Sequence, residues 1–406
     1  MIPVSEAIRI VEEQTPRLPA EAVALADARG RVLAEDIVAD MDLPPFDRAL
    51  MDGYAVRAAD TTGAAADAPV RLTIAGEAAA GAGWRGELQP GEAVRIMTGA
   101  PVPAGADSVQ QVEVTRELEG GAFVEIERAT TPSQFITKRA TEITRGATVL
   151  RAGETINAAM MAALASFGYA RVRVGARPRV SVLATGTELV AVGAQPGADQ
   201  IRDSNSYSLL AYAEAAGASV EHAPFAADDA ELLQQVIGER AKHADVLVLS
   251  GGVSMGVYDF TKTALRSLGA EIFFERVSLR PGKPTVFARL GRTLVLGLPG
   301  NPVSVSVTFN LFARTAIRAM QGARAAALVE EDAVLGRGVK GAIERASYLP
   351  AELRTDALGR LVAEPLRWGG SSDFVAFTRA DALVIVEAGV KTVEADAIVR
   401  VVRLPA

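Results

Sequence analysis

The stretch VLVLSGGVSMGVYD, residues 246–259, shows most directly how this chain is expected to fold. Four apolar residues lead into Ser250-Gly251-Gly252, a pattern that predicts a buried strand ended by a glycine turn. Near-continuous apolar strands are typical of parallel sheets that have helices on both faces. Asp259 follows where the next helical pattern begins, so it could simply cap that helix. The stretch predicts an α/β domain with polar residues just beyond a strand.

Strands and helices alternate on both sides of this stretch. The strand segments RVSVLAT, SVEHAPF and DVLVLS are separated by patterns of helical periodicity. The predicted helices cover residues 207–216, 229–242, 261–268 and 303–320. This alternation predicts a three-layer α/β domain with a mostly parallel sheet.

The rest of the 406-residue chain is predicted to form further domains, because one hydrophobic core seldom serves so long a chain. Short alternating segments between residues 70 and 124 predict a small β domain inserted in the N-terminal half. The end of the chain loses its helical periodicity, which predicts a C-terminal β domain. The predicted limits are 1–45 with 140–176 for a linking domain, 46–139 for the inserted β domain, 177–327 for the α/β domain and 328–406 for the C-terminal domain.

Composition disfavours several classes of protein. A net charge of −7 argues against a nucleic-acid partner, which would need a basic face. The chain has no cysteine and two histidines, so thiolate sites, three-histidine zinc sites and Ser-His-Asp triads are disfavoured. A bound metal would need oxygen ligands, which favours Mg²⁺. No apolar run approaches the ~18 residues of a membrane span, and the first residues lack the basic start of a signal peptide. We therefore expect a cytoplasmic protein without a membrane partner.

Four turns are expected at the carboxyl ends of strands, where ligands bind in open α/β sheets. They are residues 185–188 (TGTE), 228–229 (DD), 250–252 (SGG) and 299–302 (PGNP). Each also has a structural interpretation, since Asp228-x-x-Glu231 is a capping box and Asn301-Pro302 is a natural helix start. The two interpretations are compatible, because the free N–H groups of a helix start can face an anion.

Basic and acidic residues follow these turns. A helix N-terminus contributes only about 0.3–1 kcal/mol to a nearby anion, so an anion site also needs cations. The candidates are Arg276, Arg280 and Lys283. The acids Glu188, Asp228 and Asp259 would repel that anion and one another, and a cation such as Mg²⁺ would resolve the conflict.

Seven motifs occur in one order along the chain. They are PPFDRALMDGYAVR (44–57), RIMTGAPVPAGAD (95–107), ATGTEL (184–189), DSN (203–205), SGGVSMGVYDFT (250–261), RPGKP (280–284) and GLPGNPVS (297–304). On these motifs the chain closely resembles the molybdopterin molybdenumtransferases, the MoeA family, which includes the C-terminal domain of gephyrin. The resemblance extends over essentially the whole chain, although the C-terminal residues match only loosely.

The resemblance implies an elongated homodimer of four-domain subunits, with the site at the subunit interface. It implies a reaction of adenylylated molybdopterin with molybdate, in the presence of Mg²⁺, to give molybdenum cofactor and AMP. A molybdopterin adenylyltransferase is an expected partner. The residues carried over as catalytic are Asp52, Thr98, Glu188, Asp228 and Asp259, of which the first two would come from the second subunit and the last three would bind the metal. The residues expected to bind substrate are Ser250, Gly251, Gly252, Arg276, Arg280, Lys283, Pro299, Asn301, Pro302 and Ser371.

The chain departs from the family pattern at several positions. Arg276 and Arg280 stand where the family often has lysines, Thr187 where an acid is common, and Ala49 where a serine is frequent. Residues 138–142, KRATE, replace a more usual basic-Gly-Glu-Asp sequence, which leaves the role of Glu142 open.

Two other functions stay open on the sequence. A molybdopterin adenylyltransferase resembles the α/β domain alone and needs no extension such as residues 1–170. A non-catalytic pterin-binding scaffold could have lost any of Asp52, Glu188, Asp228 and Asp259, which this chain retains. The sequence does not separate molybdate from tungstate, since both are tetrahedral dianions of nearly equal size.

Overall fold

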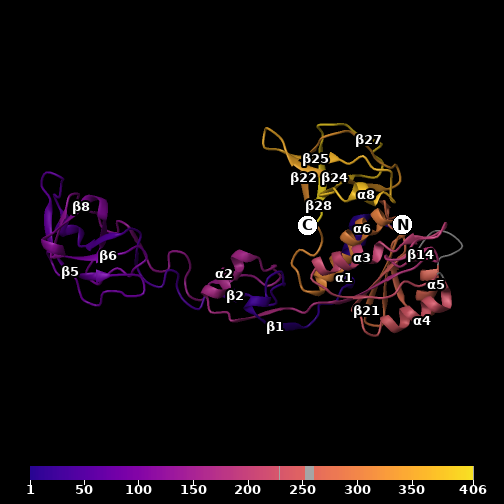
Figure 1. Ribbon diagram of the computed structural model, residues 1–406, viewed down its shortest axis with the longest axis horizontal. Coiled ribbons are helices and arrows are strands. Elements are labelled where there is room, and N and C mark those ends of the chain that lie inside the picture. The colour runs from indigo at the N-terminus through magenta and orange to yellow at the C-terminus, as the bar shows by residue number, and fades with distance from the viewer. Residues whose placement is uncertain (228, 252–259, 406) are drawn as a thin grey trace. The chain divides into compact units, whose positions relative to one another are not determined.

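The computed structural model describes residues 1–227, 229–251 and 260–405, and the chain divides into two compact units (Figure 1). One unit comprises Met1–Glu35, Arg151–Met161 and Ala170–Ala406. The other comprises Asp36–Leu150 and Ala162–Tyr169. The limits of the four predicted domains stay a prediction. None of the described helices is long and apolar enough to cross a membrane.

A six-stranded sheet forms the centre of the α/β domain, in the order β16-β13-β17-β21-β20-β18. The four strands β16, β13, β17 and β21 are parallel, and β20 and β18 add an antiparallel edge. The mostly parallel sheet predicted from the sequence is therefore confirmed. The bounds are β13 Arg179–Ala184, β16 Ser219–His222, β17 Val246–Ser250, β18 Glu271–Phe274, β20 Val286–Leu290 and β21 Thr293–Leu298.

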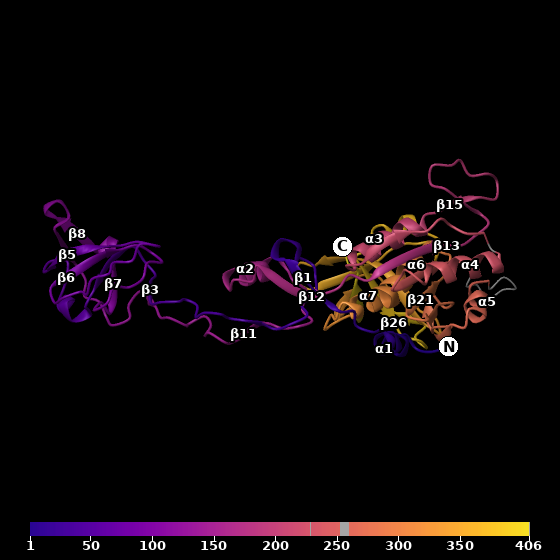
Figure 2. The same cartoon turned by 90° about the horizontal axis from the view of Figure 1, so that it is seen from below.

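Both faces of this sheet are buried. Successive side chains of a strand point to opposite faces, so the apolar residues of one strand enter two different hydrophobic clusters. In β17, Val246 and Val248 belong to one hydrophobic cluster, and Leu247 and Leu249 belong to another. Helices cover each face, so the expected three layers are present (Figures 1 and 2). The first cluster includes residues of α1 Val4–Gln14, α3 Asn205–Ala215, α6 Pro302–Thr308 and α7 Arg314–Met320, and the second includes residues of α4 Ala230–Arg240 and α5 Phe260–Ser267.

Two local predictions need correction. The α-helix expected over residues 303–320 is interrupted, because a π-helical segment, Phe309–Ala313, separates α6 from α7. The capping role expected of Asp228 at the start of α4 belongs to Asp229, whose carboxylate accepts a hydrogen bond from the Leu232 N–H at 2.8 Å. Asp228 itself lies outside the described residues.

The C-terminal domain is a closed barrel. Its strands pair in the order β24-β25-β22-β28-β26, and a further β24–β26 pairing closes the ring, which removes exposed strand edges. The short strand β19, Leu279–Arg280, pairs in parallel with β24 and so joins the RPGKP segment to the barrel. The bounds are β22 Glu330–Leu335, β24 Ala346–Thr355, β25 Leu361–Pro365, β26 Ala382–Val386 and β28 Ile398–Arg403.

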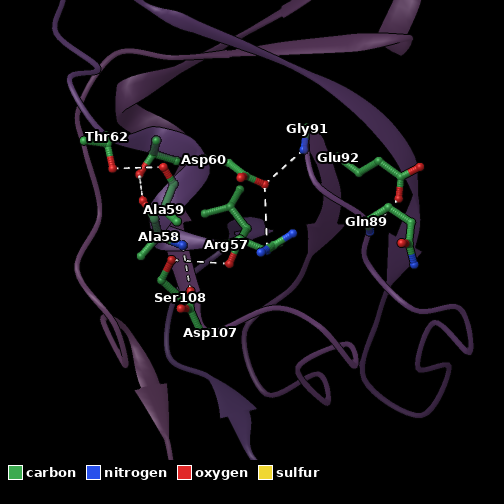
Figure 3. A network of polar contacts seen from close by, with 12 residues as sticks. Arg57, Ala58, Ala59, Asp60, Thr62, Gln89, Gly91, Glu92, Asp107 and Ser108 are labelled. Carbon is green, nitrogen blue, oxygen red and sulfur yellow. Dashed lines mark hydrogen bonds and ion pairs between the residues drawn. The ribbon is translucent and has the colours of Figure 1, made fainter.

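The inserted β domain lies in the second unit and contains a sheet of order β7-β4-β6-β5-β9-β8. Figure 3 shows polar contacts that hold its loops: the Ala58 N–H donates to Asp107 at 2.7 Å, and the Gly91 N–H donates to Asp60 at 3.0 Å. Asp107, from the second sequence motif, thus fixes the chain that follows the first motif. The bounds are β4 Gly53–Val56, β5 Val70–Ala78, β6 Glu92–Ile96, β7 Ser108–Gln111, β8 Thr115–Leu118 and β9 Phe123–Ile126.

Replacing Gly53 by alanine is expected to destabilise this β domain, because a Cβ there would lie 1.9 Å from the Gln110 carbonyl oxygen. Overpacking of this kind costs roughly 1–3 kcal/mol. The chain has two tryptophans, and one of them, Trp84, is partly buried and packs against the core of this domain. Urea unfolding followed by fluorescence in a Trp368→Phe background therefore reports on the domain. Gly193→Ala is the control, since its Cβ meets nothing within 4 Å; equal urea midpoints for the two variants would contradict the prediction.

Candidate functional site

The carboxyl ends of β13 and β17 and the turn between β21 and α6 border one cavity of about 850 Å³. Its outer wall includes residues of β14, Leu189–Val190, and β15, Ile201–Arg202, which pair in an extension that projects from the α/β domain (Figure 2). Residues of five motifs line the cavity: Thr185, Glu188, Asp203, Asn205, Ser250, Gly251, Pro284, Pro299, Asn301 and Pro302. Segments far apart in the sequence thus border one space.

Asn205, at the start of α3, ties two of these walls together. Its Nδ2 donates hydrogen bonds to the Ser250 Oγ at 2.9 Å and to the Gly300 carbonyl oxygen at 2.7 Å. The buried Asp203 accepts from the Ser206 N–H at 3.0 Å and fixes the start of the helix. The Asn205 Oδ1 is also buried, and it accepts no hydrogen bond from the described part of the chain. Asn205 belongs to the DSN motif, but nothing in the sequence placed its side chain in the site.

Gly251 is required by close packing at the edge of the sheet. Its φ is +97°, and a Cβ there would lie 2.3 Å from the Thr185 carbonyl oxygen. The Gly251 N–H donates to the Leu298 carbonyl oxygen at 3.2 Å, so it is already used within the sheet edge. The prediction that Gly251 binds substrate therefore rests on its place in the cavity wall.

A second cavity, of about 680 Å³, adjoins the first and shares Pro284, Pro299 and Asn301 with it. We call it the basic cavity, because five cationic side chains and no acidic one occur among the described residues that line it. Such a group creates a positive potential that attracts anions. The five are Arg280 and Lys283 of the RPGKP motif and Arg337, Lys340 and Arg345 of the C-terminal domain. Sequence reasoning missed the last three, because no motif links them to RPGKP.

The PGNP turn connects the α/β domain to the C-terminal domain. Asn301 occupies the N-cap position of α6, and Pro302 begins the helix. The Asn301 side chain makes no capping hydrogen bond; its Nδ2 donates instead to the Ser371 Oγ at 2.9 Å. The Val303 N–H donates to the Ser371 carbonyl oxygen at 3.0 Å. Ser371 is thereby held in the wall of the basic cavity, next to the turn.

Other predicted residues lie away from the two cavities or outside the described residues. Arg276 is exposed and lines neither cavity. Asp228, Gly252 and Asp259 lie outside the described residues. The metal-binding set of Glu188, Asp228 and Asp259 therefore stays a prediction. Over residues 1–227, 229–251 and 260–405, no three His, Cys, Asp or Glu side chains gather as a metal site.

Asp52 and Thr98 belong to the second compact unit, where they contact each other. The Asp52 carboxylate accepts hydrogen bonds from the Thr98 N–H at 2.6 Å and from the Thr98 hydroxyl at 2.7 Å. The backbone hydrogen bond and then the hydroxyl bond lower the pKa of Asp52 below its ordinary value, because both stabilise the charged form. Two residues 46 positions apart thus form one anionic group.

The departures from the family pattern that lie in this unit take structural roles. Ala49 is buried and pairs with Ile136, so a serine there would need a hydrogen-bond partner. Glu142 accepts from Arg48 at 2.8 Å, and the Lys138 ammonium contacts Asp47 at 2.8 Å. The Glu142 side chain, whose role the sequence left open, thus forms an ion pair beside the first motif.

Three family models match consecutive parts of the chain. The MoeA N-terminal region (domain I and II) matches residues 2–168. A model described as "Probable molybdopterin binding domain" matches residues 181–319, and the MoeA C-terminal region (domain IV) matches residues 332–404.

Curated relatives and solved structures also match over most of the chain. The molybdopterin molybdenumtransferase of Bacillus subtilis (strain 168) is 36% identical over 402 residues, which is 98% of this chain and 93% of that protein. Molybdopterin molybdenumtransferase 2 of Mycobacterium tuberculosis is 40% identical over 327 residues, covering 79% of this chain and 80% of that protein. A crystal structure of the molybdopterin biosynthesis MoeA protein from Pyrococcus horikosii has a TM-score of 0.81 at 31% identity and covers 99% of both chains.

Replacing Thr98 by valine is expected to raise the pKa of Asp52 toward its ordinary value, because the hydroxyl donor is lost. The rise should be incomplete, since the backbone hydrogen bond is the larger cause of the lowered pKa and remains. NMR titration of the Asp52 carboxyl carbon measures this, with Thr98→Ser as the control that keeps a hydroxyl. An unchanged Asp52 titration in Thr98→Val would show that the hydroxyl does not stabilise the carboxylate.

Proposed function

Since this chain belongs to the MoeA family of molybdopterin molybdenumtransferases, we propose that its adjoining cavities serve the transfer of molybdenum from molybdate to adenylylated molybdopterin. The phosphoanhydride of the adenylylated substrate is cleaved, and molybdenum cofactor and AMP are the products. The observation that carries the proposal is the convergence of five motif segments on two adjoining cavities. A set of unrelated turns and caps would have no reason to converge there.

The basic cavity supports the binding of anionic groups, which include molybdate and the substrate phosphates. Arginine and lysine from two domains supply the positive charge. Ser371 adds a hydroxyl that the Asn301 amide already holds in place. Such preorganised donors bind an oxyanion without the free-energy cost of reorganisation.

The acidic residues support the binding of Mg²⁺ in the larger cavity. Glu188 lines this cavity, and Asp228 and Asp259 complete the proposed ligand set. Bound Mg²⁺ would neutralise negative charge on the phosphate oxygens while the phosphoanhydride is cleaved. The proposal also includes a cytoplasmic homodimer in which Asp52 and Thr98 reach the site of the partner, and a molybdopterin adenylyltransferase that supplies the substrate.

The adenylyltransferase alternative has less support. An enzyme that consists of the α/β domain alone does not account for the MoeA matches over residues 2–168 and 332–404. The non-catalytic scaffold alternative differs from the proposal in one measurable property, the release of AMP.

The intact chain, supplied with adenylylated molybdopterin, molybdate and Mg²⁺, is expected to release AMP. Replacing Asp259 by asparagine should lower the rate on the order of 100-fold, because loss of a carboxylate ligand weakens the bound metal. AMP is quantified by chromatography, with reactions that omit Mg²⁺ as the control. Wild-type release no greater than that of Asp259→Asn would reject the transferase and favour the scaffold.

Replacing Arg345 by alanine is expected to raise the molybdate concentration for half-maximal AMP release by about tenfold or more, because a charged hydrogen-bond donor contributes roughly 1.5–3 kcal/mol. The effect should shrink at high ionic strength, since salt screens the cations. Arg354→Ala is a matched control in the same domain, because Arg354 lies near Glu364 at 3.7 Å and lines neither cavity. Equal half-maximal concentrations for the two variants would exclude Arg345 from anion binding.

A further inference from the structure

A third and smaller cavity, of about 260 Å³, opens beside the larger one. It lies among α3, α6 and α8, Phe374–Phe377, which are neighbours in the structure (Figure 1). Ser204, Asn205, Pro302 and Phe374 line both this cavity and the larger one. A single ligand could therefore extend from one into the other.

The lining of this cavity is uncharged and rich in aromatic groups. None of the described residues that line it is Asp, Glu, Lys, Arg or His, in contrast to the five cations of the basic cavity. Tyr212 stacks on Phe309 with the ring centroids 5.5 Å apart, so its ring is fixed in the wall. Phe374 is 51% exposed, and it lines both this cavity and the larger one. These walls favour a flat, neutral ring over an anion.

The polar atoms of the lining are mainly acceptors. The hydroxyls of Ser208, Ser306 and Thr378 donate their protons to the carbonyl oxygens of Asn205, Pro302 and Val375, at 3.0, 3.0 and 2.7 Å. A hydroxyl whose one proton is used in this way can only accept from a ligand. The Asn310 Nδ2 donates to the Ser306 carbonyl oxygen at 2.9 Å, which leaves its Oδ1 as the complementary acceptor group.

Asn310 occupies the π-helical segment that interrupts the helix after α6. Such insertions are frequent at functional sites, because they turn a side chain away from its helical position. The residue is 2% exposed and lines the cavity. A ligand that donates hydrogen bonds along one edge would match this lining.

We propose that this third cavity binds the pterin ring of the substrate through its N–H-bearing edge, an inference that rests on the proposed function. The pyrimidinone edge of a pterin carries an amino group beside a ring N–H, so it offers adjacent donors. Adenine, the other ring of the adenylylated substrate, offers one amino group among acceptor nitrogens. The volume of 260 Å³ lies below the roughly 300–1,000 Å³ of pockets for whole drug-sized ligands, which suits a single ring system. The phosphate end of the substrate then extends toward the charged cavities.

The test measures binding of tetrahydropterin to the intact chain by calorimetry, without any transfer reaction. Phe374→Ala is expected to weaken binding about tenfold, because stacking on an aromatic ring is lost. Thr378→Val, which removes an acceptor at similar volume, should weaken it about fivefold. The matched control is Val375→Ala, since Val375 is 67% exposed, adjacent in sequence and absent from the cavity wall. Its affinity for tetrahydropterin should equal that of the wild type.

Ligand variants identify which ring and which edge is bound. Tetrahydropterin methylated at the pyrimidinone N–H, beside the amino group, should bind at least about fivefold more weakly, because a donor is replaced by a methyl group. Adenine should fail to displace tetrahydropterin. Three results would each overturn the pterin assignment. They are undetectable binding of tetrahydropterin, wild-type affinity for it in both Phe374→Ala and Thr378→Val, and stronger binding of adenine than of tetrahydropterin. If tetrahydropterin binds with the expected pattern but the chain releases no AMP, the transferase is rejected and the pterin subsite is kept. If the chain releases AMP but Phe374→Ala and Thr378→Val bind tetrahydropterin as tightly as the wild type, the pterin subsite is rejected and the transferase is kept.

Discussion

The parallel pairing of β13, β17 and β21 is the constraint on which the rest of the site depends. Parallel strands end at the same edge of a sheet, and the register here places Ala184 opposite Ser250 and Ser250 opposite Leu298. The turns that follow the three strands must then lie side by side. Gly251 allows this close approach, and the Asn205 amide joins Ser250 to the PGNP turn. The larger cavity is thus a consequence of strand register, completed by one side chain from a helix.

Joining the α/β domain to the barrel separates the charges of the site. The pairing of β19 with β24 carries Arg280 toward the cations of the barrel, and the Asn301–Ser371 hydrogen bond holds the second point of contact. Five cations therefore gather in one cavity, while two carboxylates, Glu188 and Asp203, and one cation, Arg202, line the other. A positive potential attracts anions and a carboxylate attracts a cation, so adjoining spaces select different chemical groups. The third cavity, with an uncharged lining, adds a selection for shape and hydrogen-bond donors.

The first sequence motif has roles within the inserted β domain that need no ligand. Gly53 permits β4 to approach β7, and the neighbouring Tyr54 is buried with its hydroxyl donating to Glu117. Burial, and then the hydrogen bond to Glu117, raise the pKa of Tyr54, so this hydroxyl stays protonated. These contacts hold the backbone next to Asp52, whose carboxylate Thr98 stabilises in its charged form. Structural roles and a candidate catalytic group therefore fall on three consecutive residues, Asp52, Gly53 and Tyr54.

The sequence by itself determined the local elements and the family. Apolar runs such as residues 246–249 predict buried strands, and the glycine turns after them predict where polar groups emerge, because these preferences act over a few neighbouring residues. Only the tertiary structure decided that Arg337, Lys340 and Arg345 join Arg280 and Lys283, since that meeting depends on a strand pairing between distant segments. It also decided that Asn205 joins two walls and that Asp229 caps α4 in place of Asp228. Charges on separate segments carry no pattern along the chain, so their grouping is set by packing in three dimensions.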